Sequence, residues 1–254
     1  MNKLHFTAAS LLTATFLSTP ALADDVDADY LNSLTGNKIS WSDSEGTAVT
    51  IGEKTFYYTY NKPDDYTETS TRINNTLATA DVDNKVFTNI SGPADGGAIY
   101  SKGTNISDLD INSDFVNNSS SATSSTTAYG AGLSLRGTPI SLGTISGDFV
   151  GNTTSSATGS VVGPAIYFDS TSSAAATIDT IEGNFVNNYG HSTGASGKFI
   201  HGGAIDNHAT INNINANFIG NRAKSQNSYV WGGAINNTSQ ASASDAFSGV
   251  IGTL

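Results

Sequence analysis

The sequence contains no cysteine among its 254 residues. This absence excludes disulfide bonds, thiolate catalysis and zinc sites built from cysteine. Basic side chains are also few, because 11 lysines and arginines stand against 22 aspartates and glutamates, for a formal net charge of −11. The chain has neither the positive charge that neutralises phosphates nor a polybasic membrane anchor, so we expect no nucleic-acid partner.

Charged residues of either sign make up only 13% of the chain, and hydrophobic residues only 37%. The polarity comes instead from serine, threonine and asparagine, with 26 glycines among them. These residue types are poor or mediocre helix formers. The composition predicts a chain that is either rich in β structure or disordered, and the repeats described below favour β structure.

Residues 1–23 have the pattern of a cleaved secretory signal. Lys3 provides a short basic start, an apolar run extends from Phe6 to Leu17, and Ala21-Leu22-Ala23 has the small-x-small spacing that signal peptidase recognises. The run is shorter than the roughly 20 apolar residues that span a bilayer. We therefore expect cleavage between Ala23 and Asp24 and a secreted mature chain.

Two short motifs alternate through the chain after about residue 85. The first motif is Gly-Gly-Ala-Ile, and looser versions of it end in Leu133 and Ile166. Its full copies contain Gly96, Gly97 and Ile99, then Gly202, Gly203 and Ile205, then Gly232, Gly233 and Ile235. The second motif is Phe-x-x-Asn, with the pairs Phe115/Asn118, Phe149/Asn152, Phe185/Asn188 and Phe218/Asn221. Copies recur about 34 residues apart, so one unit of that length is repeated.

Each repeat is predicted to form three short strands, because apolar residues recur within it at two- or three-residue steps. The first strand would contain the Ala-Ile of the glycine motif, the second an isoleucine-rich run, and the third the Phe-x-x-Asn motif. The inserts that follow vary in length and are rich in serine, threonine, glycine and asparagine, which is typical of surface loops. The four inserts are Ser119–Tyr129, Thr153–Val162, Tyr189–His201 and Arg222–Trp231.

A unit of this length cannot bury its apolar face alone, but stacked copies can. We therefore predict an all-β fold, a parallel β-solenoid whose equivalent strands lie one layer apart at roughly 4.8 Å. The motif phenylalanines would stack inside as an aromatic column, and the motif isoleucines as an aliphatic column. The motif asparagines would turn a corner with left-handed backbone geometry and form a hydrogen-bonded ladder. The paired glycines would permit the sharp turn into the first strand.

Alternating Gly-Gly-Ala-Ile and Phe-x-x-Asn motifs, behind a signal peptide in a cysteine-free chain, resemble the passenger of autotransporters of the polymorphic membrane protein type. The resemblance covers roughly residues 85–254. It implies a right-handed parallel β-helix displayed at the outer membrane or cell surface of a Gram-negative bacterium, commonly as an adhesin. It also implies a C-terminal outer-membrane β-barrel in the full-length parent, and this sequence departs from the family in lacking that part.

Residues 251–254 align with 142–145, which precede a Phe-x-x-Asn motif, so we expect a fragment or truncated product that is incomplete at its C-terminus. Residues 24–84 lack both motifs. Within them, Ala48–Ile51 and Lys54–Tyr60 flank Gly52-Glu53, and this pattern predicts a β-hairpin. We expect this region to be a small β cap over the first layer of the solenoid, with a carbohydrate-binding patch of tyrosines as the alternative.

Enzymes built on parallel β-helices, such as polysaccharide lyases and glycosidases, need converging carboxylates, in some cases with calcium and a basic residue. Six acidic residues lie where the repeat predicts turns or outward-facing positions, and we interpret them as solvated: Asp108, Asp110, Asp148, Asp179, Glu182 and Asp206. Three histidines, His191, His201 and His208, lie in one unit. A metal site or catalytic dyad is the less favoured interpretation of them.

The sequence thus predicts a non-enzymatic, secreted or surface-displayed binding module with an adhesin-like role and no catalytic residue, cofactor or metal. Its partner would be an unidentified protein or glycan on a host or neighbouring cell surface. We expect contact through the inserts after Asn118, Asn152, Asn188 and Asn221. A β-helical polysaccharide lyase or glycosidase is the alternative function.

Overall fold

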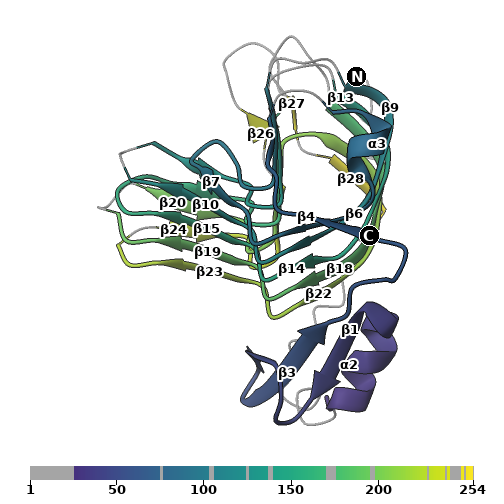
Figure 1. Ribbon diagram of the computed structural model, residues 1–254. Coiled ribbons are helices and arrows are strands. Elements are labelled where there is room, and N and C mark those ends of the chain that lie inside the picture. Colours follow the sequence, from purple (N-terminus) through teal and green to yellow (C-terminus); the bar gives the residue numbers. More distant parts are fainter. Residues whose placement is uncertain are drawn as a thin grey trace, which may run out of the picture.

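The computed structural model describes residues 26–74, 77–102, 106–123, 126–136, 140–169, 176–194, 198–227, 229–237, 239–240, 247–248 and 250–253. The expected secretory signal and its cleavage between Ala23 and Asp24 lie outside these residues. Parallel strands from successive repeats stack into a β-solenoid of about four turns, which confirms the predicted fold class (Figure 1).

The longest sheet pairs parallel strands in the order β4-β6-β9-β13-β18-β22-β28, with β14 between β9 and β18. Its strands are β4 (Thr67–Thr69), β6 (Asp83–Thr88), β9 (Ile106–Val116), β13 (Ile140–Ser146), β14 (Phe149–Val150), β18 (Ala176–Val186), β22 (Thr210–Ile219) and β28 (Val250–Thr253). In β9, β18 and β22 the isoleucine-rich run and the motif phenylalanine share one continuous strand. The prediction of two separate strands is therefore wrong, except where β13 and β14 divide.

A second parallel sheet carries the aliphatic column. Its strands, in paired order, are β5 (Ile73–Asn74), β8 (Ile99–Lys102), β12 (Leu133–Arg136), β17 (Ile166–Asp169), β21 (Ile205–Asn207) and β25 (Ile235–Asn237). Ile99, Leu133, Ile166, Ile205 and Ile235 lie in register on neighbouring strands, as predicted. A separate antiparallel pair near the C-terminus consists of β26 (Ser239–Gln240) and β27 (Phe247–Ser248).

The inserts form two further parallel sheets rather than loops, which corrects the prediction. One sheet contains β7 (Ser91–Pro93), β10 (Ser119–Ala122), β15 (Thr153–Ser156), β19 (Tyr189–Ser192) and β23 (Arg222–Ser225). The other contains β11 (Ala128–Tyr129), β16 (Val161–Val162), β20 (Phe199–His201) and β24 (Tyr229–Trp231). Together they make an arm, the name used below for these two sheets, which extends from one side of the solenoid (Figure 1).

Small side chains on alternate residues explain why such polar inserts form strands. On β10, Ser120 and Ala122 are buried while Ser119 and Ser121 face outward, and β15 and β19 repeat this alternation. The interior of the arm contains Ala122, Ala128, Val161 and Ile200. Two of the hydroxyl groups on the buried side donate to carbonyl oxygens of the arm: Ser120 Oγ to Tyr129 at 2.6 Å, and Ser192 Oγ to Gly159 at 2.9 Å. Two-residue periodicity, rather than polarity, thus determines the local structure.

The predicted aromatic column is confirmed, and it contains one ring more than predicted, that of Phe87. Phe87, Phe115, Phe149, Phe185 and Phe218 stack one per coil, with ring centroids 4.6 to 5.2 Å apart and planes within 14° of parallel. The first four rings are fully buried and Phe218, in the last of these coils, is partly buried. One ring per layer at nearly the inter-strand spacing makes this column the centre of the core.

The asparagine ladder is also confirmed. The Nδ2 of Asn118 donates to Oδ1 of Asn152 at 3.1 Å, that of Asn152 to Asn188 at 3.0 Å, and that of Asn188 to Asn221 at 2.8 Å. The predicted left-handed geometry, however, belongs to the preceding residue of each coil: Asn89, Asn117, Gly151, Asn187 and Gly220 have φ of 53° to 67°. The ladder residue is the one that follows this turn.

The glycine motif combines a turn with a close approach between coils. Gly202 has φ of 64°, a conformation that L side chains rarely adopt. A Cβ on Gly97 would collide with the carbonyl oxygen of Ala131 in the next coil. The two glycines of the motif therefore have separate roles, since one turns the chain and the other admits the neighbouring backbone.

The N-terminal region contains the predicted hairpin, but it does not cap the first layer. Helix α2 (Ala28–Thr35) and the 3-10 turn η1 (Gly36–Lys38) precede a sheet of order β1-β3-β2, formed by β1 (Ile39–Ser42), β2 (Thr47–Ile51) and β3 (Lys54–Tyr60). Its apolar residues pack against Val86, which precedes Phe87, and against Val116, Val150, Val186 and Ile219, each of which follows a column phenylalanine. The N-terminal domain, residues 26–66, thus docks along the flank of the solenoid.

A shorter segment closes the first layer instead. Strand β4 pairs with β6, β5 pairs with β8, and Val82 of α3 (Thr79–Val82) is buried in the solenoid core. Arg72 Nε donates to the carbonyl oxygens of Gly96 and Gly97 at 3.2 and 3.1 Å. The predicted cap is therefore confined to about residues 67–82.

Candidate functional site

The outer face of the arm is a flat sheet surface whose chemistry changes along the coil axis. Neighbouring strands place Ser119, Thr153, Tyr189 and Arg222 in one row, and Ser121, Ser155, His191 and Lys224 in the next. The coils that contain Ser119 and Thr153 present hydroxyl groups. The coils that contain Tyr189 and Arg222 present aromatic and basic side chains. The Tyr189 and His191 rings stack at 5.6 Å, and the Arg222 guanidinium lies 5.0 Å from the Tyr189 ring centre.

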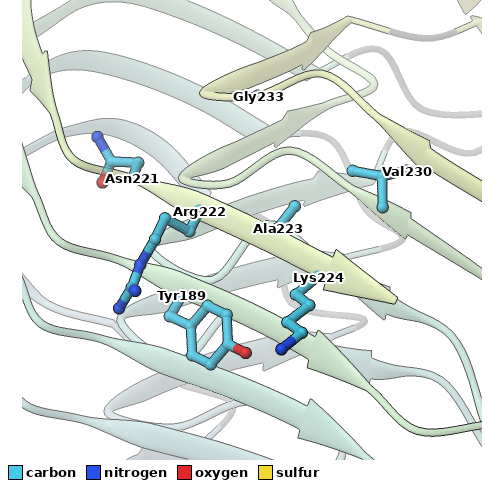
Figure 2. A pocket seen from close by; sticks show the side chains of 7 residues that line it. All are labelled: Tyr189, Asn221, Arg222, Ala223, Lys224, Val230 and Gly233. Atoms are coloured by element: carbon cyan, nitrogen blue, oxygen red, sulfur yellow. The ribbon is translucent and has the colours of Figure 1, made fainter. Parts of the chain in front are cut away.

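A pocket of about 530 Å³ lies where these last two coils meet the interior of the arm. It is lined by Tyr189, Asn221, Arg222, Ala223, Lys224, Val230 and Gly233 (Figure 2). Arg222 and Lys224 are exposed, and they extend to the same side of the sheet as Tyr189. In a chain with a net charge of −11, the pocket therefore combines two cations with an aromatic face.

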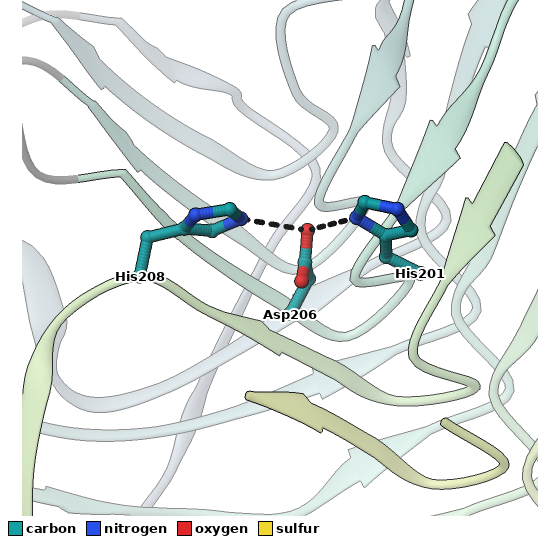
Figure 3. Close-up of side chains that lie close together, drawn as sticks. All are labelled: His201, Asp206 and His208. Carbon is teal, nitrogen blue, oxygen red and sulfur yellow. Dashed lines mark hydrogen bonds and ion pairs between the residues drawn. The ribbon is translucent and has the colours of Figure 1, made fainter. Parts of the chain in front are cut away.

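A second constellation lies where the arm meets the solenoid, at the inner corner between β20 and β21. His201 ends β20, Asp206 is in β21, and His208 follows two residues later. Figure 3 shows both imidazoles directed at one carboxylate oxygen: Asp206 Oδ2 lies 3.5 Å from His201 Nδ1 and 3.3 Å from His208 Nε2. All three side chains are buried, with 7%, 0% and 6% of the residue surface exposed.

Contact between the histidines and the Asp206 carboxylate favours the charged form of Asp206 and of His208. Burial alone would lower the pKa of His208, but its contact with Asp206 raises that pKa above 6.5. Burial alone would raise the pKa of Asp206, but contacts with His201 and His208 hold it below the usual value. The Nδ2 of Asn236 donates to the other carboxylate oxygen, Oδ1, at 2.7 Å. The corner thus favours a charged carboxylate with Oδ2 turned toward the imidazoles.

Aromatic rings line the same corner in the neighbouring coils. Tyr167 meets His208 edge-on at 5.8 Å, while Trp231 stacks on His201 at 4.7 Å. Two coils before His201, the Arg136 guanidinium lies 3.7 Å from the ring centre of Tyr129. The buried carboxylate is therefore surrounded by side chains that restrict the access of water.

The sequence indicates His201, Asp206 and His208 as candidates, but it does not predict that they lie together. His201 and His208 were considered together with His191, which the structure places on the outer face of the arm, stacked on Tyr189. A usable signal was the spacing of Asp206 and His208, because residues two apart lie on the same face of a strand. The position of His201 depended on the course of the insert, which was predicted to be a loop.

The six acidic residues considered for catalysis divide into two groups. Asp108, Asp110, Asp179 and Glu182 are exposed, as predicted. Asp148 and Asp206 are 2% and 0% exposed, so their interpretation as solvated residues is wrong. Asp206 is covered by the arm, and Asp148 by the N-terminal domain, neither of which the repeat pattern places.

Asp148 belongs to a polar row that joins the solenoid to the N-terminal domain. Asp114 accepts hydrogen bonds from the Asp148 backbone N at 2.7 Å and from the Tyr60 hydroxyl at 2.7 Å, and its other contact is an ion pair with Lys38 at 3.0 Å. Asp148 Oδ1 accepts from the backbone N and the Nδ2 of Asn184, both at 2.9 Å. Oδ2 of Asp148 is buried and makes no hydrogen bond within the described part of the chain. Burial and the nearby Asp114 carboxylate raise the pKa of Asp148 to about 6.

Asp148→Asn is expected to stabilise the protein by about 2 kcal/mol at pH 7. With a folded-state pKa of about 6 against the ordinary 3.8, the cost of ionising Asp148 in the folded state grows as the pH rises from 3.8 and reaches about 3 kcal/mol above pH 6. The variant loses some attraction to Lys38 but avoids most of this cost. Asparagine already occupies the same row at Asn184 and Asn217, where each Nδ2 donates to the preceding coil.

The advantage of the variant should shrink by about half between pH 7 and pH 5, because Asp148 takes up a proton as the pH falls through 6. Urea unfolding followed by Trp41 fluorescence at both pH values measures it. Glu182→Gln, which changes an exposed acid on the same sheet, is the matched control and should show neither effect. A destabilised variant, or an advantage that grows at low pH, would contradict the assignment of Asp148.

Comparisons with family models, with curated proteins and with solved structures found no match for this chain. Within the described residues, no helix has the length and apolar character needed to cross a membrane.

Proposed function

We propose that the protein is a non-enzymatic binding module, a secreted or surface-displayed passenger of the autotransporter type, with an adhesin-like role. The observation that carries the proposal is the arm, in which every insert adds two strands to a stacked platform on the same side of the solenoid. An ordered sheet fixes the backbone beneath its outer side chains, so binding does not require the ordering of a loop. The proposed partner is a protein or glycan on a host or neighbouring cell surface.

The end of the arm that carries Tyr189, His191, Arg222 and Lys224 is the proposed contact area. An aromatic face can stack on a sugar ring or pack against a protein, and tyrosine and arginine are enriched at the centres of interfaces. The adjoining rows of serine and threonine hydroxyls supply further donors and acceptors. The cations also favour a ligand with acidic groups, since the rest of the chain is strongly acidic.

The repeat itself supplies conservative variants for a test. Tyr189→Thr with His191→Ser gives the third coil the residues that the second coil has at Thr153 and Ser155. Arg222→Thr with Lys224→Ser extends the same change to the fourth coil. We expect the fourfold variant to bind host cells or a glycan array about tenfold more weakly, a loss of about 1.4 kcal/mol of binding free energy.

Glu182→Ser is the control, because Ser146 occupies the same position in the preceding coil and the residue is exposed on the long sheet, outside the arm. Its binding should equal that of the unchanged chain. If the fourfold variant melts normally and adheres as well as the control, the contact area lies elsewhere. Loss of binding in both variants would contradict the assignment to the arm.

The competing function, a polysaccharide lyase or glycosidase, requires carboxylates that a polymer can reach. Asp148 and Asp206 are buried, which leaves the exposed Asp108, Asp110, Asp179 and Glu182. Pectin, alginate and glycosaminoglycans with calcium provide a direct test. Turnover that Asp179→Asn abolishes would overturn the binding-module proposal.

A further inference from the structure

We propose that His201, Asp206 and His208 bind a divalent transition-metal ion of the zinc class at the inner corner of the arm. The site would supply three protein ligands and leave at least one coordination position for water or another ligand. This inference is independent of the proposed adhesin role, because it concerns the opposite side of the arm from the outer face.

The spacing of the three side chains suits such an ion. Zinc lies about 2.0–2.2 Å from nitrogen and oxygen ligands, so two ligands of a tetrahedral ion are about 3.3 Å apart. The separations between Asp206 Oδ2 and the two histidine nitrogens are 3.3 and 3.5 Å. The possible ligand atoms of the three residues all lie within 4.8 Å of one another. Closing the widest separation needs only a side-chain adjustment.

The donor set also selects the class of metal. Two imidazoles with one carboxylate are typical of zinc and of non-haem iron sites, whereas calcium and magnesium prefer oxygen ligands throughout. Asn236 holds Oδ1 of Asp206 at 2.7 Å, which fixes the carboxylate with Oδ2 toward the histidines. Such outer hydrogen bonds commonly orient metal ligands.

His201 provides the second, independent indication. Its imidazole is more than nine-tenths buried, yet neither Nδ1 nor Nε2 makes a hydrogen bond within the described part of the chain. Its only polar contact among the described residues is the long one between Nδ1 and Asp206 Oδ2, at 3.5 Å. Buried polar atoms nearly always have a hydrogen-bond partner, so this imidazole, directed into a polar corner with only that contact, points to a ligand. The neighbouring coils place Val162 and Trp231 at this position, so the solenoid itself does not require histidine there.

A bound ion would connect the arm to the solenoid. His201 belongs to β20 of the arm, whereas Asp206 and His208 lie in and beyond β21 of the solenoid, on the other side of the turn at Gly202 and Gly203. Because the chain has no cysteine, a disulfide cannot cross-link these two parts, whereas metal coordination can. Binding to the folded state alone would then stabilise the fold.

The test is calorimetric titration of the purified full chain with Zn²⁺, after treatment with EDTA. We expect one ion per chain, and a melting temperature that rises by about 5 °C at a Zn²⁺ concentration a hundredfold above the dissociation constant. Co²⁺ in place of Zn²⁺ should give the visible absorption of a four- or five-coordinate ion. Absence of saturable binding would overturn the proposal.

Two variants remove a proposed metal ligand and replace it with the residue that a neighbouring coil has at the same position. Asp206→Asn copies Asn236, and His201→Val copies Val162, so both should fold. Each should weaken Zn²⁺ binding by about 100-fold or more and abolish the Co²⁺ absorption. His191→Ser is the matched control, since it removes a histidine from the outer face of the arm and should leave affinity unchanged. Equal affinity in Asp206→Asn, or loss of binding only in His191→Ser, would refute the site.

Discussion

Phe149→Ala is expected to lower the free energy of unfolding by about 3–5 kcal/mol, the range measured for phenylalanine truncation in well-packed cores. Phe149 is fully buried and stacks between Phe115 and Phe185, with ring centroids at 4.6 and 4.8 Å. Removing the ring leaves a cavity inside the solenoid and breaks two aromatic pairs, each worth about 0.5–1.5 kcal/mol beyond burial. Urea denaturation followed by circular dichroism measures the loss.

Phe218→Ala is the control for this prediction, because it truncates the same column at a partly buried ring, which stacks on Phe185 alone among the residues that the structure describes. We expect about half the loss seen for Phe149→Ala. Phe149→Leu should cost about 1.5 kcal/mol, since it keeps most of the apolar volume and removes only the stacking. Equal losses at positions 149 and 218 would show that the column does not hold the coils together.

The columns could be predicted because each depends only on equivalence between repeats. A phenylalanine or isoleucine that recurs about every 34 residues must face the same interior, whatever lies between the copies. The same reasoning aligned residues 251–253 with 142–144, and β28 pairs accordingly, with Ile251 opposite Ile211. Repeat period alone thus determined which residues of successive coils share a column.

The arm could not be predicted in this way, because its strands consist of residues whose propensities favour loops. Alternating burial of Ser120, Ala122, Thr154 and Ser156 becomes informative only when neighbouring coils already supply paired backbones. Apolar pairs such as Val161-Val162, just before the glycine motif, were a signal of the second arm sheet. In this part of the chain, stacking between coils overrides local preference.

The docking of the N-terminal domain on the flank of the solenoid could not be predicted from the sequence, for a different reason. Residues that follow the column phenylalanines, such as Val116 and Val150, are apolar although they point away from the core. This outer apolar row required a covering element, and residues 26–66 provide it. The burial of Asp148 follows from that docking, so no argument from the repeat alone could have placed it.

The corner site shows the same dependence on remote contacts. His208 lies one residue beyond β21, and its two-residue spacing keeps it on the same side of the chain as Asp206. His201 reaches them only because the insert forms β20 and turns at Gly202. The sequence contained the three residue types, and the fold supplied their geometry.

Asn152→Ala is expected to destabilise the protein by about 4 kcal/mol, nearly as much as the loss of the central ring. Asn152 Nδ2 donates to the Phe115 carbonyl at 2.8 Å and to Asn188 Oδ1 at 3.0 Å, while Oδ1 accepts from the backbone N and Nδ2 of Asn118, both at 3.1 Å. Alanine leaves these buried groups without their partner, and each such group costs about 1–3 kcal/mol. Urea denaturation measures the loss, and Asn212→Ala, an exposed asparagine with one bond to Asp179, should change stability by less than about 0.5 kcal/mol.

Asn152→Asp separates the geometry of the ladder from its donors. The aspartate has almost the same shape and keeps the Oδ1 acceptor, but it replaces Nδ2 with an oxygen that faces the Phe115 carbonyl and Asn188 Oδ1, two acceptors. We expect it to destabilise the protein at pH 7 at least as much as alanine does, because a buried charged oxygen that faces two acceptors costs more than a cavity. Protonation restores one donor, so stability should recover partly as the pH falls toward 4. An aspartate variant as stable as the unchanged chain at pH 7 would mean that shape alone, rather than the donated hydrogen bonds, connects the coils at this corner.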